Sequence, residues 1–250
     1  RMGCKAELQK YIRRCLYRLN NKKIECNSHT TRNLEDTMKK IVAINAGPRK
    51  GWNTDQLIKE AAKGSEFAGA EIEYVDLFRL EKYTGCISCF GCKRKGNFGK
   101  CVYKDGLYDV LEKIRNADGL IIGSPNYMGD VTASFRALFE RLTFQYLTYN
   151  LEKPSYNEHL IPILFILTSN SEDSSYEEGG FYGDLIPKHK YSFERFVGPT
   201  NVLVCGNTVQ VKDYSIYDWT MFDGDAKKEH HDKTFQSYLE KAYKMGQNLV

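Results

Sequence analysis

Residues 40–54 read KIVAINAGPRKGWNT, an apolar run followed by a basic, glycine-containing turn and then by the start of a helical pattern. Ile41 to Ile44 has the continuous apolar character of a strand buried on both faces, and Thr54 to Lys63 is predicted to be a short helix. A buried strand that leads through a short loop into a helix is the repeating unit of parallel-sheet proteins. This stretch therefore predicts an α/β fold.

The same alternation continues to the end of the chain. Further strands are expected at the more polar Glu71 to Leu77, and at Leu120 to Ile122, Ile161 to Leu167 and Val202 to Cys205. Helices are expected around Leu107–Ile114, after Asp105, around Phe135–Leu142, and around Phe235–Leu249. Five strands with such crossovers predict a doubly wound parallel sheet in the flavodoxin-like order 2-1-3-4-5. Ligands of such sheets bind beyond the carboxyl ends of strands one and three, where the order reverses.

The loop after the first strand carries features of a phosphate site. It lacks both GxGxxG and the P-loop pattern, but two glycines allow close backbone approach and two basic residues add positive charge. Asn53 is predicted to cap the following helix, with Gln56 three residues later, which leaves free N–H groups for an anion. The candidate residues are Gly47, Pro48, Arg49, Lys50, Gly51, Asn53 and Thr54. An ordinary basic turn remains the alternative interpretation.

The loops after the third and fourth strands are candidates for holding a flat ring. Pro125 fixes the backbone and Gly129 permits a tight turn, so the N–H groups between them can face the polar edge of a ring. Tyr127 is expected to stack or pack against that ring. The predicted ring-binding residues are Pro125, Asn126, Tyr127, Met128 and Gly129, with Thr168, Ser169 and Asn170 as a third loop at the ring edge. No catalytic side chain is predicted.

Four of the eight cysteines fall close together, at Cys86, Cys89, Cys92 and Cys101. Three thiolates at every third position and a fourth across a short loop can wrap one inorganic core, and the basic run Lys93 to Lys95 would offset their charge. This spacing favours a 4Fe-4S cluster. A zinc site uses the same ligands but usually as two separate CxxC pairs, and unligated thiols are the third interpretation.

Composition and charge limit the remaining possibilities. The chain has 250 residues, 42% of them apolar, which suits one elaborated domain and a tail. Residues 1–37 hold nine basic and four acidic residues, a balance of +5 against +4 for the whole chain, so the rest sum to −1. We expect a basic, helical tail over 1–37 and one domain over 38–250 with a cysteine loop at 85–102. A near-neutral body argues against nucleic acid, and without a long apolar run or leader pattern we expect no membrane contact and a cytoplasmic location.

These motifs together resemble the NADPH-dependent FMN reductase family of the flavodoxin superfamily, and the cysteine run resembles that of its iron–sulfur flavoprotein branch. The resemblance covers Lys40 to about Leu142, with a weaker match to the end of the chain. Arg136, Glu140 and Arg141 stand at the places of the usual Lys, Asp and Arg, although the family commonly has Ser where this chain has Gly47. It implies bound FMN and a 4Fe-4S cluster that exchanges electrons with FMN across a subunit contact. It also implies NAD(P)H or a ferredoxin-like donor, a small-molecule or protein acceptor, and a homodimer or homotetramer.

Three functional classes follow from the sequence. The first is an FMN-dependent oxidoreductase that uses NAD(P)H, the second a non-enzymatic flavodoxin-like electron carrier, and the third a zinc-stabilised binding module. Turnover with a small acceptor distinguishes the first from the second, and a colourless protein would favour the third. The aromatic-rich segment from Thr143 to Thr200 is either a lid and subunit interface or simply part of the core.

Overall fold

The computed structural model describes residues 38–250, so the helix expected in the tail over residues 1–37 lies outside the described residues. Five strands form one sheet in which every neighbouring pair is parallel. They are β1 (Lys40–Asn45), β2 (Glu71–Asp76), β3 (Gly119–Pro125), β4 (Ile163–Thr168) and β5 (Thr200–Cys205). The order is β2-β1-β3-β4-β5, which confirms the predicted fold and places the polar β2 at an edge.

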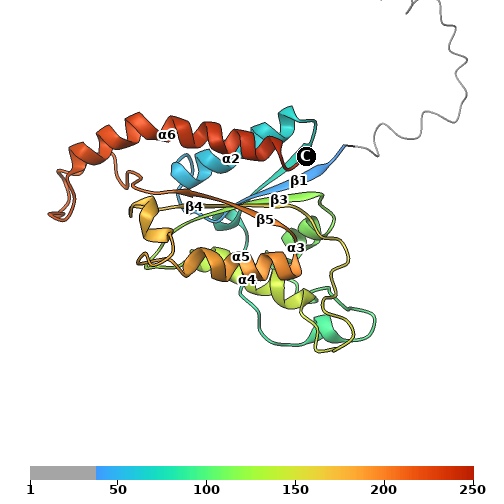
Figure 1. Ribbon diagram of the computed structural model, residues 1–250. Helices are drawn as coiled ribbons and strands as arrows, with labels where there is room; N and C mark the ends of the chain where they lie inside the picture. Colours follow the sequence, from blue (N-terminus) through green and yellow to red (C-terminus); the bar gives the residue numbers. More distant parts are fainter. Residues whose placement is uncertain (1–37) are drawn as a thin grey trace, which may run out of the picture. The chain divides into compact units, whose positions relative to one another are not determined.

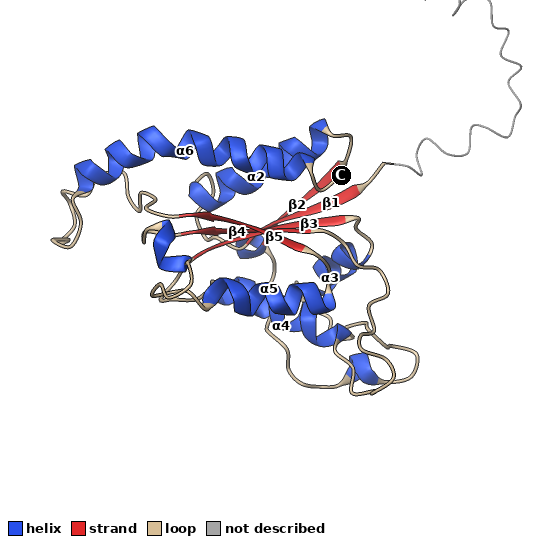
Figure 2. Cartoon of the chain, in the orientation of Figure 1, coloured by secondary structure: helices blue, strands red, loops and turns tan. Residues whose placement is uncertain are grey.

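Helices cover both faces of this sheet (Figure 1; Figure 2). α2 (Asn53–Phe67) and α6 (Gly224–Gln247) lie on one face, and α3 (Tyr108–Arg115), α4 (Ala133–Tyr146) and α5 (Leu185–Phe196) on the other. Short 3₁₀ turns occur at η1 (Leu77–Arg79), η2 (Gly91–Lys93) and η3 (Asp173–Tyr176). Successive residues of the central strands point to opposite faces, so Ile41 packs with α2 and α6 while Val42 packs with the other three helices.

The contact between α2 and α6 depends on glycine. A Cβ atom built at Gly64 would lie 2.0 Å from the carbonyl oxygen of Tyr243, and one at Gly246 would lie 1.9 Å from that of Ala61. Ser65 adds a hydrogen bond from its hydroxyl to the carbonyl of Gly246 at 2.7 Å. The two helix backbones therefore approach more closely than larger side chains allow. No helix within residues 38–250 has the length and apolar character needed to cross a membrane.

Two features differ from the sequence expectations. The segment between Thr143 and Thr200 contains α5, whose buried Leu185, His189 and Phe193 follow helical spacing and fill core. The start of α2 also differs, because Trp52 occupies the N-cap position and no side chain caps the helix. Asn53 does not cap it, since its amide donates instead to the carbonyl of Val209 at 2.9 Å.

Candidate functional site

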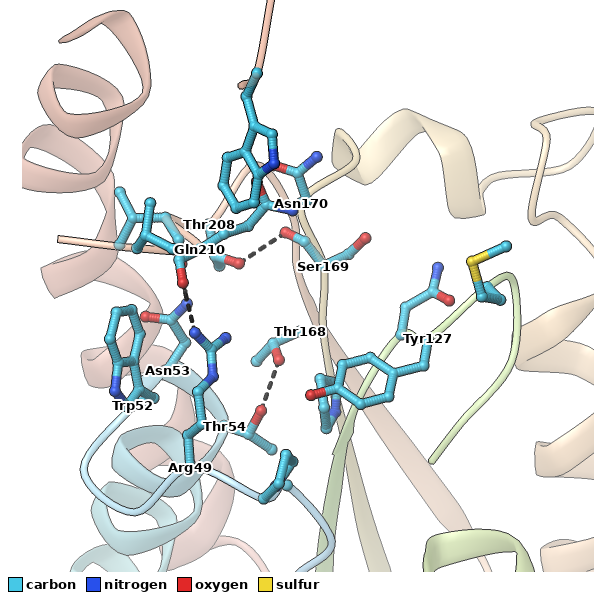
Figure 3. A pocket seen from close by; sticks show the side chains of 18 residues that line it. Arg49, Trp52, Asn53, Thr54, Tyr127, Thr168, Ser169, Asn170, Thr208 and Gln210 are labelled. Atoms are coloured by element: carbon cyan, nitrogen blue, oxygen red, sulfur yellow. Dashed lines mark hydrogen bonds between the residues drawn. The ribbon is translucent and has the colours of Figure 1, made fainter. Parts of the chain in front are cut away.

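A cavity of about 500 Å³ opens at the carboxyl ends of β1, β3 and β4 (Figure 3). Four segments meet there: the loop after β1 with the start of α2, the loop after β3, the end of β4, and the chain after β5. The lining residues are Gly47, Pro48, Arg49, Trp52, Asn53, Thr54, Pro125, Asn126, Tyr127, Met128, Thr168, Ser169, Asn170, Thr208, Val209, Gln210, Val211 and Trp219. The cavity therefore lies where the reversal of strand order predicts a ligand.

The residues predicted to bind the phosphate or the ring all line this cavity, except Lys50, Gly51 and Gly129. Lys50 is exposed. Gly51 has a φ of +76°, and its N–H donates to Asp55 Oδ2 at 2.6 Å, so it shapes the turn before α2. Gly129 has a φ of +83° and packs against Tyr182. These two glycines set the backbone course without lining the cavity.

The loop after β1 is held from both sides. The Gly47 N–H donates to Asn45 Oδ1 at 2.9 Å, and the Thr132 hydroxyl donates to the Ala46 carbonyl at 2.7 Å. The Arg49 guanidinium lies 4.2 Å from the centre of the Trp52 ring and donates to the Gln210 carbonyl at 2.5 Å. A positive charge and the uncapped start of α2 thus face the same cavity, which is the electrostatic character of an anion site.

The loop after β3 makes a tight reversal at its tip. Tyr127 and Asp130 pair across it, and Met128 and Gly129 between them both have positive φ, as in the mirror-image turns that close hairpins. Inside the loop, Asn126 Oδ1 accepts the Gly129 N–H at 2.9 Å, and Asn126 Nδ2 donates to the Tyr176 hydroxyl at 2.5 Å. Tyr176 is buried, and burial raises the pKa of its hydroxyl. The Asn126 side chain is therefore fixed by a residue from η3.

The end of β4 and the chain after β5 complete the cavity. The hydroxyls of Thr168 and Thr54 share a hydrogen bond at 2.7 Å. The Ser169 carbonyl oxygen accepts two hydrogen bonds of 2.8 Å from Thr208, one from its N–H and one from its hydroxyl. Sequence reasoning missed the wall formed by Thr208 to Val211, Trp219 and Trp52. No motif marks Thr208 to Val211 or Trp219, which reach the cavity because β5 lies parallel to β4. Trp52 stands between Gly51 and Asn53 of the predicted phosphate loop, so its place in the sequence was a signal for it.

The four clustered cysteines line a second, much smaller cavity of about 20 Å³. Cys86, Cys89, Cys92 and Cys101 share it with side chains from the second half of α4, including Arg141 and Gln145. Cys89 is exposed and Cys92 buried, and Ser88 and Phe90 on either side of Cys89 both have positive φ. Non-glycine residues rarely adopt this conformation, so the loop is strained around Cys89.

Basic side chains tie the cysteine loop to α4. Arg141, with 1% of its side chain exposed, donates to Asp105 Oδ1 at 2.5 Å, to the Tyr103 carbonyl at 2.7 Å and to Cys101 Sγ at 3.6 Å. Lys93 donates to the carbonyl of Leu147 at 2.6 Å, and to those of Gln145 at 3.1 Å and Phe144, at the end of α4.

Glu140 accepts the Cys86 N–H at 3.3 Å and pairs with Arg136 at 3.5 Å. Burial raises the pKa of the Cys92 thiol, and the neighbouring Lys93 partly offsets this effect. Across residues 38–250, no three His, Cys, Asp or Glu side chains stand close enough together to hold one metal ion.

The two cavities lie at opposite ends of α4. The helix begins directly after the loop that follows β3, and its last turns contact the cysteine loop. In Figure 1 the turquoise-to-green loop that contains η2 lies below α4, on the side away from the carboxyl ends of the strands. The two cavities share no lining residue. They are separate sites joined by one helix.

Relatives with similar sequences are iron–sulfur flavoproteins. One from Methanocaldococcus jannaschii and one from Methanosarcina thermophila are each 37% identical over 102 residues, which are 41% of this chain and 51% of each relative. One from Clostridioides difficile is 31% identical over 107 residues, 40% of this chain and 44% of that protein. The alignment thus spans about half the length of the curated relatives.

Solved structures with the same fold include redox enzymes. A NAD(P)H:quinone oxidoreductase from Methanothermobacter marburgensis superposes with a TM-score of 0.63 at 16% identity, covering 85% of this chain and all of that one. An azoreductase from Bacillus anthracis does so with a TM-score of 0.56 at 14% identity, covering 84% of this chain and 100% of that one. At such identities the likeness concerns the fold.

A family match covers more than half of the chain. Residues 39–173 match the profile described as NADPH-dependent FMN reductase. This range includes the loops after β1 and β3, the end of β4 and the whole cysteine loop. The chain therefore belongs to the NADPH-dependent FMN reductase family.

Proposed function

We propose that this protein is an FMN-dependent oxidoreductase that takes electrons from NAD(P)H or a reduced carrier and passes them to a small acceptor or a redox partner. The observation that carries the proposal is the convergence of three predicted loops on one cavity of about 500 Å³ at the carboxyl ends of the strands. Family membership supports FMN as the ligand of this cavity. Cavities of this size suit cofactors and drug-sized molecules.

An unsatisfied polar atom at the cavity fits FMN. Within the described residues, Asn170 Oδ1 is buried and has no hydrogen-bond partner, and its side chain lines the cavity. Buried acceptors without partners are costly, so they call for a ligand with donors. FMN brings hydroxyl groups on its ribityl chain and an N–H on its ring. Its phosphate would be held by Arg49 and by the N–H groups at the start of α2, beside Asn53 and Thr54.

In this proposal, side chains and backbone groups of the protein bind FMN and orient its ring. Thr54 and Thr168, bonded to each other, fix the floor of the cavity, and Pro125 to Met128 present backbone and the Tyr127 ring on one side. Tyr176 holds the Asn126 amide in place. When bound, FMN would supply hydride acceptance and the release of electrons singly or in pairs, and the protein's part would be to bind and orient its ring. Met128 at the tip of the loop after β3 is exposed.

The cysteine cavity is proposed to hold a 4Fe-4S cluster through Cys86, Cys89, Cys92 and Cys101. Arg141 Nε and Gln145 Nε2 are buried donors that find no partner in the described part of the chain, and both side chains line this cavity. Donors without acceptors beside four cysteines fit a core with negative charge and sulfur acceptors. The strained backbone at Ser88 and Phe90 is also typical of functional sites. A volume of about 20 Å³ means that the loop must widen to take the core.

The visible absorption spectrum of anaerobically purified protein tests both assignments. We expect the two bands of a flavin, which bleach when NADPH is added, over a broad shoulder that also fades if the cluster is present. The flavin released by acid denaturation should be FMN, at one per chain. A protein that stays colourless after incubation with FMN would contradict the FMN site.

Iron and sulfide analysis of two cysteine variants tests the cluster assignment separately from the FMN assignment. Iron and acid-labile sulfide should be present in the wild-type protein and absent from Cys92→Ser, which should keep its FMN. Cys205, at the end of β5 and outside the cysteine cluster, is buried. Cys205→Ala should therefore keep both FMN and the iron–sulfur cluster. Zinc without sulfide would replace the cluster assignment by a structural metal site.

A further inference from the structure

The chain between β5 and α6, residues 206–223, forms a wall of the large cavity and lies outside the family match, which ends at residue 173. It contributes Thr208, Val209, Gln210, Val211 and Trp219 to the lining. Its position is fixed by the loop after β1: Asn53 donates to the Val209 carbonyl and Arg49 to the Gln210 carbonyl. Figure 3 shows Gln210 and Trp52 across the cavity from Tyr127.

Trp219 is the aromatic residue that this segment places at the cavity. Its indole stacks on Tyr217 with 4.5 Å between ring centres and an angle of 21°. Tyr214 and Phe222 meet it edge to face at 5.9 Å and 6.3 Å. Tyr217 covers one face, so the surface that Trp219 presents to the cavity belongs to the opposite face or to the rim of the indole. With 38% of its surface exposed, Trp219 lies at the solvent side of the site.

The segment is built to hold this indole in place. Tyr214 is buried, and its hydroxyl accepts the Gln210 N–H at 3.0 Å, which closes the segment into a loop. Gly224 leaves room for the Tyr214 ring, since a Cβ there would lie 2.6 Å from it. Lys227, buried at the start of α6, donates to the Asn170 carbonyl at 3.0 Å and lies 5.5 Å from the Phe222 ring centre. An aromatic surface fixed in this way binds rings with little loss of side-chain freedom.

We propose that Trp219 is the stacking surface of a second ring site in the cavity, which binds a planar aromatic electron acceptor with a polar edge, of the quinone or nitroaromatic class. The unpartnered amide of Gln210 lies on the same wall and supplies either an acceptor or, after half a turn, a donor for the polar edge of that ring. This inference rests on the proposed FMN site, because the acceptor must stand beside the flavin.

The location of Trp219 favours the acceptor over FMN itself as its partner. FMN is common to the family, and the loops predicted to bind it lie within residues 39–173. Trp219 lies outside this matched part of the chain. Its partly exposed surface also suits a ligand that enters and leaves from solvent.

Equilibrium dialysis of oxidised, FMN-loaded protein against 2,3-dimethyl-1,4-naphthoquinone tests the proposal. Without NAD(P)H this ring is not reduced, and its substituted positions do not add cysteine thiols. We expect Trp219→Leu, which keeps apolar bulk, to weaken binding about tenfold, while Trp219→Phe stays within about threefold of the wild type. Met221→Ala, a change of an exposed neighbour in the same segment, should leave binding unchanged.

FMN affinity, measured by visible absorption, separates the possible failures. Equal quinone binding by the wild type and Trp219→Leu would overturn the second ring site. Loss of FMN rather than quinone from Trp219→Leu would also overturn it, because the indole would then serve the cofactor. If the wild type binds no FMN, the proposed function fails. The same dialysis on FMN-free protein then decides the ring site by itself, supporting it if Trp219→Leu still loses the quinone and overturning it if binding is equal.

Discussion

The hydroxyls of Thr54 and Thr168, 114 positions apart in the sequence, lie 2.7 Å apart in a hydrogen bond at the floor of the large cavity. Both residues are buried, Thr54 in the first turn of α2 and Thr168 at the end of β4. The bond therefore connects the loop predicted to hold a phosphate with the strand end predicted to hold a ring edge. It fixes the spacing of two parts of the proposed site before any ligand binds.

Removing one hydroxyl of this pair should cost more than removing both. Thr168→Val leaves the Thr54 hydroxyl buried without a partner, and we expect about 1–2 kcal/mol less free energy of unfolding in FMN-free protein. The double variant Thr54→Val, Thr168→Val should recover part of the loss, since no polar group is then stranded. Urea unfolding followed by circular dichroism measures both. Additive losses would show that the two hydroxyls do not depend on each other.

Arg141 should be a main stabilising residue of the cysteine loop. Arg141→Met removes a buried charge and leaves Asp105, with 10% of its side chain exposed, without its ion-pair partner. We expect a loss of about 3 kcal/mol in the free energy of unfolding. Arg136→Met is the matched control on the same helix, where both partners of the ion pair with Glu140 are 39% exposed, and it should change stability by less than about 0.5 kcal/mol. Similar losses in the two variants would contradict this account.

Lys93 should hold the cysteine loop against the end of α4. Its ammonium donates to carbonyl oxygens that the helix leaves without partners, and it lies 4.6 Å from the Phe144 ring centre. Lys93→Met should reduce stability by about 1.5–3 kcal/mol and speed proteolytic cleavage within residues 85–102. Lys95→Met, which removes an exposed charge of the same basic run, serves as the control. Unchanged cleavage in Lys93→Met would show that other contacts hold the loop.

His189 should make stability depend on pH. It is fully buried among Phe135, Phe139 and Phe165, and burial lowers the pKa of its imidazole below 6.5. The Leu185 carbonyl and Asp130 oppose this shift, while Lys188 and Arg136 add to it. Below pH 6.5 the unfolded chain binds a proton that the folded protein does not, so stability is full above this pH and falls as the pH decreases. The loss from this group should approach about 1.4 kcal/mol per pH unit.

Urea unfolding between pH 5 and 8 measures this dependence. His189→Leu should flatten the slope below pH 6.5 relative to the wild type. The exposed His159, changed to Leu in the same way, is the control. A wild-type slope that persists in His189→Leu would assign the pH dependence to another group.

The strand order and the two loops of the large cavity could be predicted because they follow from local patterns. Buried strands such as Ile163–Thr168 are continuous apolar runs, and parallel sheets offer few orders for five strands. The same patterns located most of the lining residues. Whether those residues bind FMN remains a prediction, as does the division of the chain at residue 38.

Other features could not be obtained from local patterns. α5 was not predicted, because its aromatic-rich segment was interpreted as either a lid and interface or core, although Leu185, His189 and Phe193 are spaced as on one helix face. Their burial agrees with the core interpretation. The cap predicted at Asn53 was wrong because a distant carbonyl, that of Val209, takes its amide. The same long-range contact positions the wall that carries Trp219. Such contacts depend on which strands become neighbours in space, and a pattern of adjacent residues does not record them.

The position of α4 between the two cavities restricts how this chain can change length. Thr132 caps the start of the helix and bonds to the loop after β1, while Arg141 and Gln145 near its end meet the cysteine loop. One residue inserted or deleted between them would rotate the second half of the helix by about 100° relative to the first. Arg141 would then point away from Cys101, although every side chain needed at either site would still be present. The rotational phase of α4 is therefore fixed by the contacts at both of its ends.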